Sequence, residues 1–316
     1  MNAFSNDRSL TAASLGETAL LSRIREWLGP CAPPSPRGMG DDCAVIEPGA
    51  NLLTCDSVVF ARHFEVSTPP DMVGAKLLKR NLSDIAAMGG IPREAVVALF
   101  LPPETTLEWL EGFTKGLAKC ALDYSVSIVG GDISQSPTLA ATLTLTGRAR
   151  RPLTRGTGGA GDILCVTGPL GASIKGHHLT FTPRIEQGIF LSINDAATAC
   201  MDLSDGLAKD APSLAGEHLA AVLDLDEIPP SAEALEQSDG DAAKLTKSVL
   251  CDGEDYELLF AVKADAVDAL EEAWVDRFGA PFFRIGHLAP RGDGPALVDS
   301  ATGKAPEGAH GYEHLR

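Results

Sequence analysis

The sequence lacks the features that mark several common classes of protein. Lys and Arg number 26 against 43 Asp and Glu, giving a formal net charge of −17. This shortage of positive charge argues against a nucleic-acid or anionic-membrane partner, because both are bound through basic surfaces. No apolar run approaches the roughly 18 residues of a membrane-spanning helix, and the polar N-terminus has no signal-peptide core.

Paired cysteines are also missing. The seven cysteines are scattered, form no Cys-x-x-Cys pair and are odd in number. This pattern argues against structural zinc and against a disulfide framework, and it favours a reducing compartment. We therefore expect a cytoplasmic protein.

The common nucleotide-binding motifs are absent too. There is no Gly-x4-Gly-Lys-Ser/Thr loop, no Asp-Phe-Gly and no His-Arg-Asp. The nearest candidate for a dinucleotide loop, residues 156–161, lacks the preceding strand and the later acidic partner. If phosphates bind to this chain, we expect them to bind through metal ions held by acidic residues.

Aspartates, in contrast, recur in short motifs beside small residues. Asp202-Leu203-Ser204-Asp205-Gly206 repeats the phrase of Asn81-Leu82-Ser83-Asp84. Three more motifs are Gly40-Asp41-Asp42, Thr54-Cys55-Asp56 and Gly130-Gly131-Asp132. One interpretation is a set of separate turn and N-cap residues, since Asp and Ser are common there.

The alternative interpretation is that the aspartates converge on metal. Two carboxylates about 4 Å apart repel by roughly 4 kcal/mol at an effective dielectric constant near 20, so a cluster needs cations. Mg²⁺ fits, because it prefers oxygen ligands and shares its shell with substrate phosphates.

The hydrophobic pattern predicts an α+β protein of two layered domains. We expect a tail over residues 1–16, an N-terminal domain over 17–150 that begins with a helix and a Pro-rich linker, and a C-terminal domain over 151–316. The Thr/Leu alternation of residues 142–146 indicates an antiparallel strand. We also predict strands at residues 52–60, 95–101 and 126–129, of which the second is short and buried and the third is buried and ends at Gly130. Helices are predicted at residues 70–88 and 104–122, and one polar helix at residues 231–247.

Two isolated residues, Arg155 and His63, have no clear role from the sequence pattern alone. Arg155 lies in an Arg- and Gly-rich stretch, residues 148–161, which is either a solvated linker or a phosphate-binding segment, since guanidinium matches phosphate oxygens. His63 is a lone histidine, and such residues are often structural or merely exposed.

The ordered motifs closely resemble the thiamine-monophosphate kinase family, of the aminoimidazole ribonucleotide synthetase and selenophosphate synthetase superfamily. The resemblance runs from about Glu17 to Tyr312 and adds a sixth motif, Gly253-Glu254-Asp255-Tyr256-Glu257. It implies ATP- and Mg²⁺-dependent phosphorylation of thiamine monophosphate to thiamine diphosphate, and a homodimer whose N-terminal halves form a barrel-like core.

The resemblance also implies a role for individual residues. It implies that Mg²⁺ is held by Asp42, Thr54, Cys55, Asp56, Asp84, Asp132, Asp202 and Asp205, of which Asp42, Asp84, Asp132 and Asp205 are the catalytic set. ATP would contact Gly131, Arg155 and Ser204, and the thiamine phosphate would contact His63, Glu254 and the position of Ala309.

The sequence departs from the family pattern at three places. The segment between Gly171 and Arg184 is shorter by roughly a helix, Ala309 stands where the family commonly has an aromatic residue, and Cys55 replaces a hydroxyl residue. A thiol is a poor Mg²⁺ ligand, although a backbone carbonyl at this position would serve. Two alternatives therefore stay open: a related enzyme with another small substrate, and a catalytically silent nucleotide-binding protein.

Overall fold

The computed structural model describes residue 19 and residues 43–47 and 51–313. The predicted tail, most of the predicted first helix, the Pro-rich linker and the Gly40-Asp41-Asp42 motif lie outside these ranges.

The first of two sheets is built mainly from antiparallel strands. Its order is β1-β2-β5-β3-β4, and only the β3–β4 pair is parallel. The strands are β1 (Ala44–Glu47), β2 (Asn51–Val59), β3 (Ile91–Leu101), β4 (Ser127–Gln135) and β5 (Ala140–Arg148). Buried and half-buried residues alternate along β5, which confirms the interpretation of the Thr/Leu pattern.

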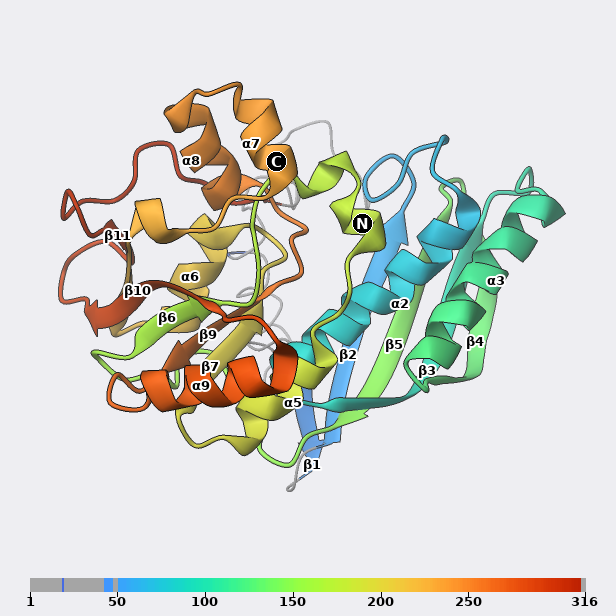
Figure 1. The fold of residues 1–316 in the computed structure, drawn as a ribbon. Coiled ribbons are helices and arrows are strands. Elements are labelled where there is room, and N and C mark those ends of the chain that lie inside the picture. The colour runs from blue at the N-terminus through green and yellow to red at the C-terminus, as the bar shows by residue number, and fades with distance from the viewer. Residues whose placement is uncertain (1–18, 20–42, 48–50, 314–316) are drawn as a thin grey trace.

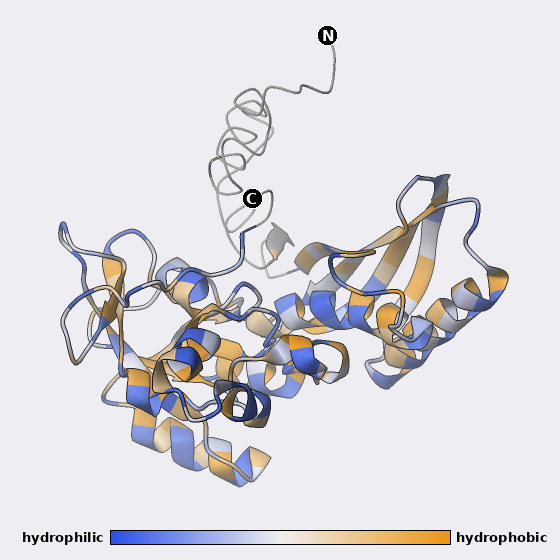
Figure 2. Cartoon of the chain, turned by 90° about the horizontal axis from the view of Figure 1, so that it is seen from above, coloured by the Kyte–Doolittle hydropathy of each residue, from blue (hydrophilic) through white to orange (hydrophobic). Residues whose placement is uncertain are grey.

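Two helices, α2 (Pro70–Ala87) and α3 (Leu107–Asp123), cover one face of this sheet. Pro at the first position of α2 has no N–H to leave unpaired, and the Thr106 side chain caps α3 through the N–H of Trp109. The apolar faces of both helices pack on Leu143 and Leu145. Figure 2 shows both helices on the same side of the sheet.

The two strands nearest the sheet edge differ from the sequence prediction. β3 is longer than the predicted residues 95–101 and half exposed. β4 does not end at Gly130 but runs through Gly130-Gly131-Asp132, and nearly all of it is exposed. The prediction of a buried strand followed by a glycine turn was therefore wrong, because apolar side chains such as Ile133 lie on a surface rather than in the core.

The second sheet has helices on both faces. Its order is β11-β8-β10-β6-β9-β7, and only the β11–β8 pair is parallel. The strands are β6 (Ile163–Val166), β7 (Ala197–Asp202), β8 (Leu219–Leu223), β9 (Leu258–Val262), β10 (Phe283–Pro290) and β11 (Leu297–Asp299).

Strand β9, next to the edge strand β7, shows how both faces are filled. Phe260 packs with α5 (Ile185–Ile193) and α9 (Val267–Phe278), whereas Leu259 packs with α6 (Leu207–Ala215) and α8 (Ala242–Cys251). Successive strand residues point to opposite faces, so a strand covered on both sides is apolar throughout.

Short helices complete this half: η4 (Ser173–Lys175), α4 (His177–Thr180), η5 (Leu225–Glu227) and α7 (Ala232–Ser238). The single helix predicted over residues 231–247 is wrong, because Asp239 and Gly240 both adopt positive φ and separate α7 from α8. No helix in the described part of the chain is long and apolar enough to cross a membrane.

Helix α2 lies between the two sheets and contacts both halves (Figure 1). Its last turn packs on α5, where a Cβ on Gly188 would lie 1.9 Å from the Ala86 carbonyl oxygen. Only glycine permits this approach of two backbones. The prediction of two layered α/β units is confirmed, while the domain boundary near residue 150 stays a prediction.

Candidate active site

A cavity of about 500 Å³ lies between the two halves. Side chains from β2, α2, β7 and the segments that follow β7, α8 and β11 line it. These residues are Asp56, Arg62, His63, Arg80, Asp84, Ile174, Asp202, Ser204, Asp205, Cys251, Asp252, Gly253, Glu254, Tyr256, His310, Gly311 and Tyr312.

Strand alternation on β2 sorts the Thr54-Cys55-Asp56 motif between the two faces of the sheet. Thr54 Oγ1 donates to Asp84 Oδ2 at 2.5 Å, and Asp56 pairs with Arg80 at 3.2 Å, so both side chains face α2. The Cys55 thiol is exposed on the opposite face, where it accepts a hydrogen bond from Thr144 Oγ1 at 3.3 Å. The thiol therefore points away from the cavity.

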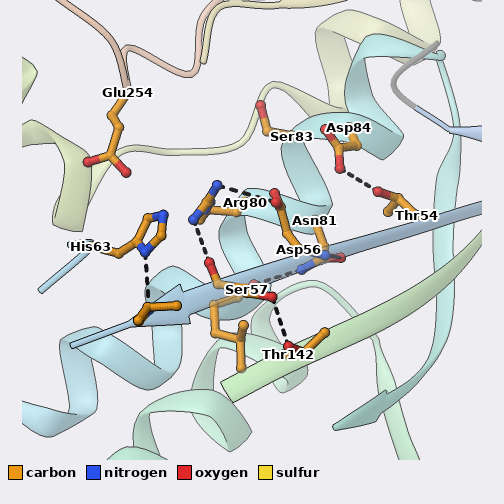
Figure 3. Close-up of polar contacts among 12 residues, drawn as sticks. Thr54, Asp56, Ser57, His63, Arg80, Asn81, Ser83, Asp84, Thr142 and Glu254 are labelled. Carbon is orange, nitrogen blue, oxygen red and sulfur yellow. Dashed lines mark hydrogen bonds and ion pairs between the residues drawn. The ribbon is translucent and has the colours of Figure 1, made fainter. Parts of the chain in front are cut away.

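Helix α2 presents three charged residues at four-residue spacing: Lys76, Arg80 and Asp84. Residues four apart stack on one helix face. Arg80 reaches both the Asp56 carboxylate and the Ser57 carbonyl oxygen, and Asn81 Oδ1 accepts from the Asp56 N–H at 3.1 Å (Figure 3). These contacts fix the Asp56 carboxylate at the cavity wall.

The Asp202–Gly206 motif connects β7 to α6. Asp210 Oδ2 accepts from the backbone N–H groups of both Ser204 and Asp205, at 3.2 and 3.1 Å. Gly206 has φ +99° beside the carbonyl oxygens of residues 251 and 252, which a side chain would meet at about 3.0 Å. The turn is thus shaped around glycine and turns Asp205 toward the cavity, where Lys209 pairs with it at 2.6 Å.

The two repeated Leu-Ser-Asp phrases meet in space. Ser83 Oγ, which is buried on α2, donates to Asp202 Oδ2 at 2.7 Å. The structure therefore brings together two motifs that the sequence separates by more than a hundred residues. Of the residues predicted from the sequence, Asp56, Asp84, Asp202, Asp205, Ser204, His63 and Glu254 line this one cavity.

His63 and Glu254 face each other across one end of the cavity (Figure 3). His63 Nδ1 accepts the Val59 N–H at 3.1 Å, which assigns the proton to Nε2. Burial on its own would raise the pKa of Glu254, but contacts with His178 and Lys76 outweigh it and lower the pKa to about 2. Glu254 is therefore a carboxylate at neutral pH.

The C-terminal segment closes another side of the cavity. The Tyr312 N–H donates to the Asp205 carbonyl oxygen at 2.8 Å, and Lys209 Nζ donates to the Tyr312 carbonyl oxygen at 3.1 Å. Ala309 is half buried and packs against the core of the second half. His310 and Tyr312 line the cavity beside it.

Several other predicted site residues do not line the cavity. Ser57, Thr142, Ala98 and Asp132 form one row across the first sheet, three strand spacings long or about 14 Å. Paired residues in a row share a face, and this row lies opposite Asp56. Asp132 and its neighbour Gly131 are thus on the exposed far edge. Arg155 lies in the turn where Gly156 donates to the Leu214 carbonyl oxygen, and Asp42 lies outside the described residues.

The charge of the cavity suits cations. Six carboxylates line it against two guanidinium groups, those of Arg62 and Arg80. Within the described ranges, no three His, Cys, Asp or Glu side chains stand close enough to hold one ion together. The carboxylate and hydroxyl oxygens are nevertheless the hard donors that Mg²⁺ prefers.

Sequence reasoning missed several cavity residues, among them Arg80, Tyr256 and Tyr312. Arg80 could have been found, because it lies one helical turn before Asp84 on a helix that the sequence predicted. The others come from loops that only the tertiary fold brings to the cavity.

Comparisons with known proteins show what the chain as a whole is similar to. Residues 40–149 match the family described as AIR synthase related protein, N-terminal domain. A thiamine-monophosphate kinase of Rhodopirellula baltica is 34% identical, with 80% of this chain and 84% of that protein covered. One of Salmonella typhimurium is 33% identical, with 87% and 90% covered. The solved structure of AaThiL complexed with AMPPCP and TMP aligns with TM-score 0.82 and 27% identity over 98% of this chain and 100% of that one.

Proposed function

Because this chain belongs to the thiamine-monophosphate kinase family, we propose that it transfers the γ-phosphoryl group of ATP to the phosphate of thiamine monophosphate. The observation that carries the proposal is a cavity between the halves, which gathers carboxylates from motifs of both halves. A solved relative carries AMPPCP and TMP, an ATP analogue and a monophosphate, and that relative matches nearly all of this chain.

We propose Mg²⁺ as the cofactor. Asp56 and Asp84 on one wall and Asp202 and Asp205 on the other offer oxygen ligands, with Thr54 and Ser83 hydroxyls behind them. Ions bound between these walls supply the positive charge that phosphate oxygens need in phosphoryl transfer. The surplus of carboxylates, next to few basic groups, fits that requirement.

The protein has little covalent chemistry to perform. The acceptor is a phosphate oxygen that is already ionised at neutral pH, so no strong general base is needed. In-line phosphoryl transfer depends mainly on positioning and charge neutralisation. Arg80 and Asn81 position Asp56, and Asp210 positions the Ser204–Asp205 backbone, so both acidic walls are held before substrate binds.

The substrate end is proposed at His63 and Glu254. The thiazolium ring of thiamine carries a permanent positive charge, which an ionised Glu254 complements. With alanine at position 309, we propose that the neighbouring His310 and Tyr312 contact the ring instead.

We propose that the enzyme acts as a homodimer paired through the first sheets. β4 is an exposed edge strand, and Ile128, Val129 and Ile133 on it are 41%, 63% and 69% exposed. Long apolar edges invite pairing with another chain. Asp132 lies on the face opposite the cavity of its own chain, so in this proposal it serves the site of the second copy. The cytoplasmic location stays a prediction from the cysteine pattern.

The test is turnover of purified protein with ATP, Mg²⁺ and thiamine monophosphate, following thiamine diphosphate and ADP, with EDTA as control. Metal-dependent formation of both products in equal amounts is expected. Saturable ATP binding without thiamine diphosphate would overturn the proposal and favour another small substrate.

A mixing experiment tests the shared site. Asp132→Asn and Asp205→Asn are each expected to be inactive. An equimolar mixture that exchanges subunits should regain about a quarter of normal activity, because about half of its dimers are mixed and one of the two sites in each mixed dimer is intact. No recovery on mixing would place Asp132 in the site of its own chain.

A further inference from the structure

Lys76 is a fully buried lysine. It lies on α2 one turn before Arg80, and its relative exposure is 0%. Lysine is almost never fully buried unless it is paired. Its position, in the interior beside the substrate end of the cavity, therefore calls for a partner of opposite charge.

Three polar atoms surround the Lys76 ammonium group. Nζ lies 2.9 Å from the His63 carbonyl oxygen, 2.7 Å from His178 Nδ1 and 2.8 Å from Glu254 Oε2. Of these three neighbours, the Glu254 carboxylate is the one that carries a negative charge. Burial lowers the pKa of Lys76, and the Glu254 charge opposes that effect.

Polar groups contact both oxygens of the Glu254 carboxylate. Oε2 lies 3.1 Å from His178 Nδ1 and contacts Lys76, and Tyr256 donates to Oε1 at 3.3 Å. Of the other charges near Lys76, Arg80 and Asp56 are paired with each other. Glu254 is thus the counter-ion that Lys76 contacts directly.

The backbone beneath Glu254 is strained. Glu254 and Tyr256 both have positive φ, 63° and 52°, and their N–H groups donate to the carbonyl oxygens of Ser204 and Leu203. Left-handed conformations of residues other than glycine persist only where surrounding contacts hold them, and they cluster at functional sites. The side-chain contacts of Glu254 are among those that hold this loop.

We infer that Lys76 is a positioning residue for substrate binding, a buried counter-ion that fixes the Glu254 carboxylate toward the thiamine phosphate. This inference rests on the proposed function. Lys76 acts through Glu254 and does not touch the reacting phosphates, so its loss affects binding of one substrate only.

The test compares Lys76→Met with Glu254→Gln and with the double variant. Each single variant is expected to raise KM for thiamine monophosphate about tenfold or more, with KM for ATP unchanged within about twofold. The double variant should be no worse than Glu254→Gln, because both changes remove one interaction. Additive losses in the double variant, or equal losses for both substrates, would overturn the inference.

Lys79→Met is the matched control. Lys79 lies on the same helix, half buried over the Phe181 ring at 5.5 Å, and contacts the Leu179 carbonyl oxygen rather than Glu254. The Lys79→Met variant should leave the KM values for thiamine monophosphate and for ATP unchanged. If Lys76→Met fails to fold, the double variant tests the inference instead, because it buries no unpaired charge. Its KM for thiamine monophosphate must then match that of Glu254→Gln.

Thermal melts separate failure of this inference from failure of the proposed function. Lys76→Met should lower Tm much more in the native background than in the Glu254→Gln background, whatever the substrate. Equal drops in Tm would overturn the pairing of the two residues. Coupled drops in a protein that does not turn over thiamine monophosphate would overturn the proposed substrate instead, and with it the role of Lys76 in binding that substrate.

Discussion

Asp255 is a buried carboxyl group at the base of the Glu254 loop, and replacing it with asparagine should change how stability depends on pH. Its relative exposure is 1%. Oδ1 accepts from the Gly171 N–H at 3.0 Å and from Ser173 Oγ at 2.5 Å, whereas Oδ2 is buried and finds no hydrogen-bond partner among the described residues. Burial raises the pKa of Asp255 from an ordinary 3.8 to about 7, although these two hydrogen bonds oppose the rise.

The direction of the pH dependence of stability follows from which state binds the Asp255 proton more tightly. The folded protein holds the Asp255 proton more tightly than the unfolded chain does, so this group makes stability fall as pH rises from about 4 to about 7, and the loss persists above. A pKa shift of about three units corresponds to a loss of at most about 4 kcal/mol in the free energy of unfolding. Between pH 5 and pH 7 the loss is about 2 to 3 kcal/mol.

Asp255→Asn keeps an oxygen acceptor for Gly171 and Ser173 but cannot ionise. It should therefore gain about 2 to 3 kcal/mol relative to the native protein between pH 5 and pH 7.5. Urea unfolding followed by tryptophan fluorescence measures this difference at each pH. Asp239→Asn, at an exposed turn, is the control and should show no pH-dependent difference. Parallel pH curves for Asp255→Asn and the native protein would refute the reasoning.

Three further predictions concern the acidic motifs. Asp132→Asn should lower turnover at least about a hundredfold and leave Tm within about 2 °C, because the residue is exposed on an edge strand; a large drop in Tm would contradict this. Gly131→Ala should destabilise the folded protein by about 1 to 3 kcal/mol, since its Cβ would lie 2.0 Å from a β3 carbonyl oxygen. Gly130→Ala, whose Cβ would have nothing nearer than 3.8 Å, should change thermal stability little. Equal effects of the two substitutions would count against the β3–β4 register. Millimolar Mg²⁺ should raise Tm, and EDTA should reverse the rise; a shift of the same size in Asp202→Asn would exclude that carboxylate as a ligand.

Local patterns predicted much of the fold because they reflect local physics. The helix over 70–88 was bounded by its Pro and its Gly-Gly, and the strand over 52–60 by its apolar run, and α2 and β2 match these ranges closely. β4 was mispredicted because a strand at an exposed edge carries the same apolar residues as a buried one. Composition cannot distinguish a strand in a core from a strand at an exposed edge.

The candidate site was predicted in the same uneven way. Asp56, Asp84, Asp202 and Asp205 were found because each lies in a short motif, and the structure brings them to one cavity. Lys76 was missed because its meaning depends on Glu254, 178 residues later. Long-range pairing of this kind leaves no periodic signal in the sequence.

The close backbone contact between α2 and α5 fixes how the cavity exchanges its contents. Since Gly188 leaves no space between the two backbones, α2 cannot swing away from the second half without breaking that contact. We therefore expect the walls of the cavity to stay together through a catalytic cycle. We then expect substrates to enter and products to leave beside the Arg62–His63 turn and residues 310–312, which line the cavity. Passage of substrates and products beside these residues, rather than hinge opening between the two halves, is then the movement that we expect with each turnover.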